Sequence, residues 1–267
     1  MRQPVRTVAV DWSGARAGAE RKIWLADARD GVVVRLECGR SQETLVAHVI
    51  DEARRTPALA VGLDFGFAFP AWYMRTLGCE DAPSLWRRMA AGEGERLLAA
   101  CAPPFWGRAG SRKPTGCVLY RRDELTLRSP ATPLKSVFQV GGAGAVGTGS
   151  IRGMAALYAL REGGFRIWPF DDAVPGGPVA VEIYPRAFTG SVVKSRPEGR
   201  RAGLAGRAPQ FARPELLELA AASEDAFDAA ISALAMSAAA DELARLPHIG
   251  DAEARLEGLI WRPGVGG

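Results

Sequence analysis

Five acidic residues lie at positions where a negative charge is costly unless the acids share a function. Asp11, Asp64 and Glu182 each end a run of β-branched and aliphatic residues (TVAVD, LAVGLD, PVAVE) that is typical of a buried strand. Asp225 and Asp228 lie one turn apart near the start of an alanine-rich helical segment. A buried, isolated carboxylate costs several kcal/mol or becomes neutral. We therefore interpret the set as a site for divalent metal ions.

The chemistry of such a site follows from its ligands. Oxygen-only ligands favour Mg²⁺ or Mn²⁺ over zinc. Two such ions roughly 3.5–4 Å apart can activate a water and stabilise the leaving oxygen of a phosphodiester. The sequence therefore predicts a phosphodiester hydrolase, with nucleic acid as its substrate. Three cations are candidates for holding the substrate phosphate: Lys135, Arg152 and Arg186.

Each acid also has a structural explanation. Asp11 can cap the turn that follows it, and Asp64 can form an Asx turn before Phe65. Glu182 can form an ion pair with Arg186. The two helix acids can offset the helix dipole, worth about 0.3–1 kcal/mol each. The order and spacing of the acids are stronger evidence for a shared site than any single member.

Bulk properties favour a globular chain in the cytoplasm. The composition is 48% hydrophobic and 24% charged, which leaves room for a sizeable core. We expect no signal peptide and no membrane span, because no apolar run is long enough. The four cysteines show no CxxC spacing and the chain has only two histidines, which argues against zinc and indicates reduced thiols.

Hydrophobic periodicity predicts the order β-β-β-α-β for the first 65 residues. Strands over 7–13, 21–28 and 32–38 form an antiparallel meander. A helix begins after Ser41 as N-cap and ends before Thr56-Pro57. The apolar run 58–65 has the pattern of a parallel strand covered on both faces.

Residues 66–135 are interrupted by seven prolines, and we interpret them as an inserted cap over one end of the sheet. One helix is expected from Ser84 to about Ala100. The aromatic residues of this region can stack on bases, but a packed lobe explains them better; they are Trp72, Trp86, Phe105 and Trp106.

The rest of the chain alternates strands and helices. Segment 195–213 carries five arginines and one glutamate, and we interpret it as a mobile basic loop, with contact to a phosphate backbone as the alternative. The other predicted elements are strands at 134–140, 165–170, 179–184 and 257–263, helices at about 150–162, 214–222 and 223–246, and a glycine cluster at 141–149.

Four motifs in this order, VAVDWSGA, VGLDFGFAFP, VEIYPRA and EDAFDAAISALA, resemble the DUF429 family. Its members are described as predicted nucleases with a fold of the ribonuclease H or Holliday-junction-resolvase type. The resemblance runs from Val8 to about Pro263 and is weakest in 66–135. It implies that Asp11 bridges two metals, that Asp64 or Glu182 binds one side, and that Asp228 with Asp225 completes the other.

A rival pattern lies in the glycine cluster, where residues 142–147 match G-x-G-x-x-G. Asp171 and Asp172 end the next predicted strand, but the first of them follows the first glycine by 29 residues rather than the ~20 of a dinucleotide site. The cluster, DWSG and LDFG also resemble the phosphate-binding turns of actin-like and sugar-kinase ATPases. A flexible loop without a ligand is the simplest alternative.

The sequence therefore predicts a single α/β domain over 1–267, with a ribonuclease H-like mixed sheet flanked by helices. The predicted function is a Mg²⁺- or Mn²⁺-dependent nuclease; an actin-like nucleotide-binding or phosphotransfer protein is the alternative. The shared site requires that the acids meet. The predicted site fails if Asp11 and Glu182 point to opposite faces of the sheet or lie farther apart than a pair of metal ions can bridge.

Overall fold

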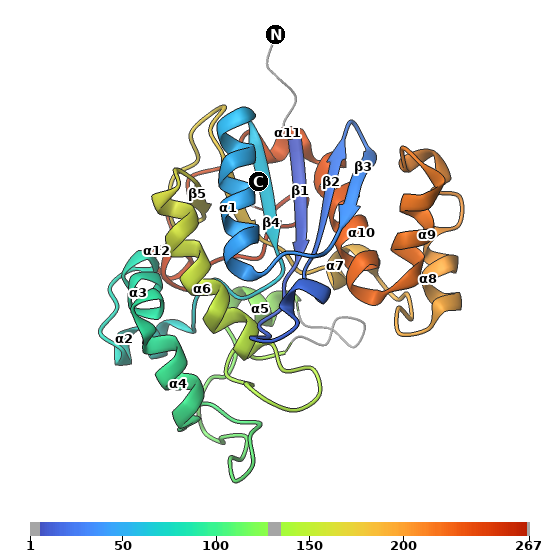
Figure 1. Cartoon of the computed structure of the whole chain (residues 1–267). Coiled ribbons are helices and arrows are strands. Elements are labelled where there is room, and N and C mark those ends of the chain that lie inside the picture. The colour runs from blue at the N-terminus through green and yellow to red at the C-terminus, as the bar shows by residue number, and fades with distance from the viewer. Residues whose placement is uncertain (1–5, 128–134, 266–267) are drawn as a thin grey trace.

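A six-stranded mixed sheet flanked by helices forms the centre of the computed structural model, which describes residues 6–127 and 135–265. The strand order is β3-β2-β1-β4-β6-β5 (Figure 1). The strands are β1 Arg6–Asp11, β2 Trp24–Arg29, β3 Val32–Glu37, β4 Leu59–Leu63, β5 Arg166–Trp168 and β6 Val179–Glu182. The three N-terminal strands are antiparallel, whereas β4, β6 and β5 run parallel to β1. The predicted α/β class and the opening β-β-β-α-β order are confirmed.

Helices cover both faces of the sheet (Figure 1). The two main covering helices of one face are α1 and α6, and α10 covers the other. The longer helices are α1 Gln42–Arg55, α6 Gly147–Glu162, α8 Pro197–Leu204, α9 Pro214–Ala222 and α10 Glu224–Ala238. The shorter ones are α2 Ala71–Thr76, α3 Ala82–Arg88, α4 Gly94–Ala100, α5 Arg122–Leu127, α7 Arg186–Thr189, α11 Ala240–Leu243 and α12 Ala252–Glu257. Single turns are the 3-10 helices η1 Ala19–Arg21 and η3 Ala208–Gln210 and the π-helix η2 Met89–Glu93.

Helix starts follow the capping residues of the sequence. Ser41 accepts a hydrogen bond from the backbone N–H of Thr44, and Ser223 accepts one from Ala226 N–H at 3.0 Å. Both are N-caps, as predicted for Ser41. The helix expected from Ser84 begins two residues earlier, because the side chain of Asp81 is the cap that accepts from Ser84 N–H.

The described part of the 66–135 segment packs as a helical lobe against α6 and α12. Its aromatic rings pack on one another: the ring centroids of Phe69 and Phe105 lie 5.9 Å apart, and those of Phe69 and Tyr73 lie 5.1 Å apart. Trp86 is fully buried. These rings form a packed core, so base stacking by them is not supported.

Two predicted strands are wrong in detail. The strand expected over 134–140 begins outside the described residues, and 135–140 form a turn with one bridge from Gln139 to Trp106. The strand expected over 257–263 is reduced to one bridge between Ile260 and Glu182. In both segments turn-forming contacts replace a continuous ladder.

The basic segment 195–213 is largely helical rather than a mobile loop. Pro197 lies in the first turn of α8, where its missing N–H costs nothing. The buried guanidinium of Arg200 donates to the carbonyl oxygens of Lys194 at 2.6 Å and Ala221 at 2.8 Å. These bonds fasten α8 to the end of α9. Within the described residues, none of the helices has both the length and the apolar character needed to cross a membrane.

Close approach of α10 to the sheet depends on Gly62 in β4. A Cβ atom at this position would lie 2.5 Å from the sulfur of Met236 in α10 and 2.8 Å from Cγ2 of Ile183. Real side-chain contacts do not come this close, so a larger residue must displace the helix or its neighbours.

We predict that Gly62→Ala lowers the free energy of unfolding by about 1–3 kcal/mol, the usual cost of overpacking a core. Urea denaturation measures the change. Gly250→Ala is the matched control, because Gly250 is exposed and a Cβ there meets no atom within 4 Å. Equal effects of the two substitutions would contradict the close-packing role of Gly62.

Candidate active site

Asp11 and Asp64 lie side by side at the carboxyl ends of two adjacent parallel strands. The register pairs Val10 with Leu63, and Asp64 N–H donates to the carbonyl oxygen of Val10 at 3.1 Å. Neighbouring strands lie ~4.8 Å apart, so each Asp follows its strand at the same level of the sheet. Successive side chains of a strand alternate between faces, and Ala9 packs in the core cluster of α10. Both carboxylates therefore point to the face that α10 covers.

Helix α10 brings the other two acids to the same place. The cap at Ser223 starts the helix so that Asp225 lies in its first turn and Asp228 in its second. Asp228 is buried, with a relative exposure of 3%. Alanines on either side of Asp228 keep the helix slim, and Ala226, Ala229 and Ala230 are buried. Asp11, Asp64, Asp225 and Asp228 are called the acid cluster below.

Burial and repulsion by neighbouring acids raise the pKa of every member of the acid cluster; for Asp225 the repelling acid is Glu224. Burial is the largest cause for each. Repulsion by Asp64 and Asp228 further raises the pKa of Asp11 well above its ordinary value. The pKa of Asp64 rises to about 8, with repulsion by Asp228 as the next cause. Without a cation, the cluster therefore retains protons near neutral pH.

One lysine opposes these charges. The ammonium of Lys194 contacts Oδ2 of Asp228 and lowers the pKa of Asp11, Asp64 and Asp228 toward their ordinary values. Sequence reasoning missed Lys194, which lies in the irregular segment between α7 and α8. The only sequence signal was its place in the VVKSRP stretch after the VEIYPRA motif, and a lone lysine there is not specific.

The acid cluster fits a hard divalent cation by its chemistry. All of its donors are carboxylate oxygens, the ligands that Mg²⁺ and Mn²⁺ prefer. Oδ1 of Asp228 is buried and accepts no hydrogen bond, which is unusual for a buried oxygen. Among the described residues, no group of three or more His, Cys, Asp or Glu side chains is already gathered closely enough to hold an ion. Binding would thus require the carboxylates to close around the metal.

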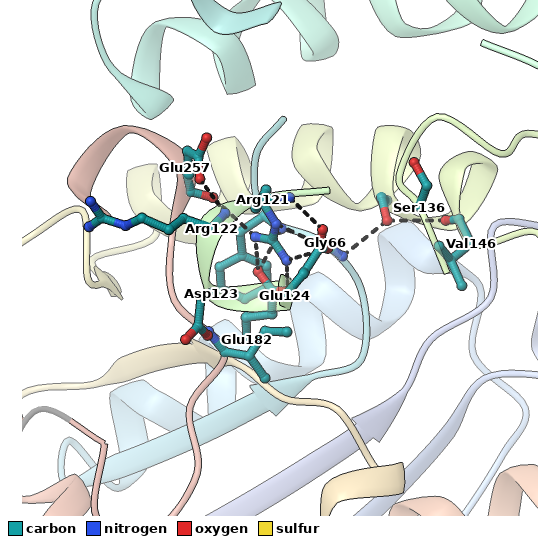
Figure 2. A network of polar contacts seen from close by, with 12 residues as sticks. Gly66, Arg121, Arg122, Asp123, Glu124, Ser136, Val146, Glu182 and Glu257 are labelled. Carbon is teal, nitrogen blue, oxygen red and sulfur yellow. Dashed lines mark hydrogen bonds and ion pairs between the residues drawn. The ribbon is translucent and has the colours of Figure 1, made fainter. Parts of the chain in front are cut away.

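Glu182 does not point toward the acid cluster, although it lines the same cavity as Asp64 and its charge raises the pKa of Asp64. On β6 it alternates with Val181, which packs on the α10 face, so the Glu182 side chain points to the opposite face. There its carboxylate pairs with the buried guanidinium of Arg121, whose Nη1 lies 2.7 Å from Oε2, and it accepts from Phe67 N–H at 2.9 Å (Figure 2). The predicted site, in which Asp11 and Glu182 bind the same ions, is therefore wrong, and only the acids on the α10 face stay candidates for a metal site. An ion pair was one alternative, but its partner is Arg121 rather than Arg186.

Arg121 links the helical lobe to the end of the sheet. Its guanidinium also donates to Glu124 at 3.0 Å and to the carbonyl oxygen of Glu257 at 3.0 Å (Figure 2). Burial opposes the charge of Arg121, but the two carboxylates outweigh it and raise its pKa. Glu257 in turn accepts from Ala71 N–H at 2.6 Å. Segments that are far apart in sequence therefore depend on one buried cation.

A cavity of about 600 Å³ opens beside the acid cluster. Asp64 and Lys194 line it, together with the turn after β1 and the glycine cluster before α6. Cationic side chains gather around the same space, and Lys22 and Lys135 among them are exposed. An anionic group bound here would meet the ammonium groups of these lysines and, from the acid cluster, the carboxylate of Asp64.

The three predicted phosphate contacts have different positions. Lys135 lies exposed on the cavity wall, where a phosphate contact is possible. Arg152 also lines the cavity, but its guanidinium binds Glu95 at 2.7 Å and the carbonyl oxygen of Gly14. Arg186 is not among the residues that line the cavity, and it donates to the carbonyl oxygen of Val192 at 2.7 Å. Arg186 therefore shapes the segment that carries Lys194.

The glycine cluster forms a loop that leads into α6 and packs closely on its neighbours. A Cβ on Gly14 would lie 2.5 Å from the backbone N of Gly149, and Trp12 Nε1 donates to the Gly149 carbonyl at 3.1 Å. The acids expected for a dinucleotide site are engaged elsewhere: Asp171 pairs with Arg161 and Asp172 with His248. These contacts do not support the dinucleotide interpretation.

We predict that Asp64→Asn removes part of the pH dependence of stability in metal-free protein. A folded-state pKa of about 8, against an ordinary 3.8, means that the protonated form stabilises the fold at low pH. That stability is fully present below about pH 4 and is lost as the pH rises to about 8, by at most about 1.4 kcal/mol per pH unit. The asparagine cannot ionise, so its unfolding free energy should fall less over this range.

Thermal unfolding in a chelator across this pH range measures the difference. Asp241→Asn is the control, because the Asp241 side chain is 95% exposed. The same pH profile for wild type and Asp64→Asn would contradict the raised pKa.

We also predict that Arg121→Met lowers the unfolding free energy by about 3–5 kcal/mol, because it leaves the buried carboxylates of Glu124 and Glu182 unpaired. Arg122→Met is the matched control. Arg122 pairs with Asp251 at the surface, where an ion pair contributes at most about 1 kcal/mol. Denaturant unfolding at neutral pH compares the two, and equal small losses would rule out the anchoring role of Arg121.

Comparisons with protein-family models, with curated proteins and with solved structures found no match to this chain. Its function is therefore inferred from the acid cluster, Lys194 and the cavity beside them.

Proposed function

We propose that the protein is a Mg²⁺- or Mn²⁺-dependent hydrolase of phosphodiester bonds in nucleic acid. One observation carries the proposal: Asp11 and Asp64 end two adjacent parallel strands, Asp228 on α10 lies close enough to repel both, and Asp64 lines a cavity together with Lys22, Lys135 and Lys194. Structural ion pairs do not explain this arrangement, because Lys194 is the one cation in direct contact with the acid cluster among the described residues.

The acidic side chains would bind the metal ions, and the lysines would bind the substrate phosphate. Asp11, Asp64, Asp225 and Asp228 would hold the divalent ions through their carboxylate oxygens. Bound divalent ions would supply an activated water and charge stabilisation for the leaving oxygen. Lys194 and Lys135 would hold the non-bridging phosphate oxygens. Water adds to phosphorus while the P–O ester bond breaks, so the products are a phosphomonoester and an alcohol.

The mixed sheet agrees with the ribonuclease H-like fold that the DUF429 resemblance implies. An antiparallel β3-β2-β1 meander followed by a parallel β4, with Asp11 ending the first strand, is the arrangement expected of that fold. Membership of the family and its fold remain part of the proposal. Glu182 is left out of the ligand set.

A second candidate function rests on the glycine cluster. Ala145, Thr148 and Gly149 line the same cavity as Ser13 and Gly14 of the DWSG turn. Backbone turns of this kind suit the phosphates of a nucleotide. An actin-like nucleotide-binding or phosphotransfer protein would therefore use this cavity for ATP with Mg²⁺, with the acid cluster holding the ion.

We predict that Asp11→Asn, Asp64→Asn and Asp228→Asn each reduce cleavage of labelled DNA or RNA with Mn²⁺ by about a hundredfold or more, because bound ions supply several kcal/mol of transition-state stabilisation. Calorimetry with Mn²⁺ should show weakened binding in the same variants. Asp241→Asn is the control for loss of an acid, and Glu182→Gln should keep Mn²⁺ binding.

The outcomes separate the two candidates. Cleavage of a strand that each of the three variants abolishes supports the hydrolase. Tight binding of ATP with Mg²⁺ and no cleavage of any strand favours the nucleotide-binding protein. Unchanged Mn²⁺ affinity in all three variants would overturn both.

A further inference from the structure

A second hollow, of about 410 Å³, lies next to α4 and is lined by arginines. Its charged residues are Arg16, Arg96, Arg108 and Arg152, with Glu95 as the one acid. Four positive charges against one negative charge leave a net charge of +3. This space, with the four arginines that line it, is called the arginine hollow below. Such a concentration contrasts with the modest +4 of the whole chain.

Glu95 fixes two of the arginines and leaves the others to solvent. Its carboxylate binds Arg16 at 2.6 Å and Arg152 at 2.7 Å. These contacts lower the pKa of Glu95, so it stays ionised. Arg96 and Arg108 are exposed, and neither guanidinium forms a hydrogen bond or ion pair with any residue in 6–127 or 135–265. Two oriented and two unengaged guanidinium groups therefore face the same space.

The arginine hollow adjoins the cavity of the acid cluster. Arg152 lines both spaces, so they share a wall. The loop that carries Arg108 packs on the glycine cluster: a Cβ on Gly107 would lie 2.2 Å from the carbonyl oxygen of Gly141. Ser111 holds this loop in a tight turn by accepting from the N–H groups of residues 107 and 108. A ligand can therefore extend from one space into the other.

The charges that line the two spaces together favour a ligand that carries several linked negative groups. Guanidinium groups bind phosphate oxygens in a forked, two-bond geometry. A single nucleotide needs only one of the two spaces, whereas a phosphodiester backbone carries regularly spaced charges that can occupy both. Neutralising such charges releases counterions, which makes binding weaken steeply with salt.

We propose that the arginine hollow is the track that holds the nucleic-acid backbone next to the phosphodiester placed at the acid cluster. The track rests on the proposed function in taking the acid cluster as the point of cleavage. Arg16 and Arg152, held by Glu95, position the backbone near the cavity. Arg96 and Arg108 hold the phosphates farther along the strand.

The test measures binding without cleavage. A labelled single-stranded oligonucleotide is titrated with protein in EDTA, and fluorescence anisotropy is followed at several salt concentrations. The double variant Arg96→Glu/Arg108→Glu should weaken binding by roughly tenfold or more and reduce the salt slope by about 1.4, the value for two lost phosphate contacts on a single strand.

The control makes the same charge change away from the hollow. Arg54 and Arg75 are exposed arginines on α1 and α2, so Arg54→Glu/Arg75→Glu should bind almost as the wild type does. An equal loss in both double variants would overturn the track, since it would reflect net charge alone. Poly-glutamate that competes as strongly as the oligonucleotide at equal charge would also overturn it, in favour of an acidic peptide.

The track and the hydrolase can fail separately. Asp11→Asn should retain binding in EDTA while losing cleavage with Mn²⁺. Selective loss of binding in the arginine variant supports the track even if no strand is cleaved. Cleavage that depends on the acids but is unchanged in the arginine variant overturns the track and leaves the hydrolase standing.

Discussion

Repulsion between carboxylates that the backbone holds together is the constraint on which the site depends. Hydrogen bonds of the parallel β1–β4 pair fix Asp11 beside Asp64, and α10 brings Asp228 against them. With Asp225 the cluster has four acids and one contacting lysine, a net charge of −3 if all are ionised. Two unit charges ~4 Å apart repel by ~4 kcal/mol at an effective dielectric of ~20. The folded chain therefore favours binding of protons or of divalent cations at these carboxylates.

Alternation of side chains along the strands separates two kinds of buried acid. Asp11 and Asp64 point to the α10 face, where cationic partners are scarce, whereas Glu182 points to the other face and is paired with Arg121. An acid with a buried guanidinium partner holds segments of the chain together. Acids without one are available to a ligand. A difference of one position along β6 is thus enough to change a carboxylate from a potential ligand into an anchor.

Local patterns in the sequence were sufficient for the strands and for most of the acid cluster. Short apolar runs bounded by turn residues located β1 to β4, and the i, i+3 spacing placed Asp225 and Asp228 on one face of α10. Contacts between residues that are far apart in the sequence could not be predicted. The partner of Glu182 lies 61 residues away, and Lys194 reaches Asp228 from 34 residues away. The sequence analysis missed α8 because its stretch is basic and contains glycines, which is typical of a loop. The contacts of the buried Arg200 with the end of α9 cannot be predicted from that stretch.

Segregation of charge explains how acids and a polyanion can share one surface. Carboxylates at the end of the sheet repel a phosphate backbone, whereas the arginine hollow beside them attracts it. Attraction in the hollow can hold a strand near the acids, but the last approach of a phosphodiester needs positive charge between it and the carboxylates. Lys194 supplies one such charge, and the acid cluster can take up more in the form of divalent ions. The net charge of +4 for the whole chain does not reveal this separation, because the negative charges of the acid cluster and the positive charges of the arginine hollow largely cancel in the sum.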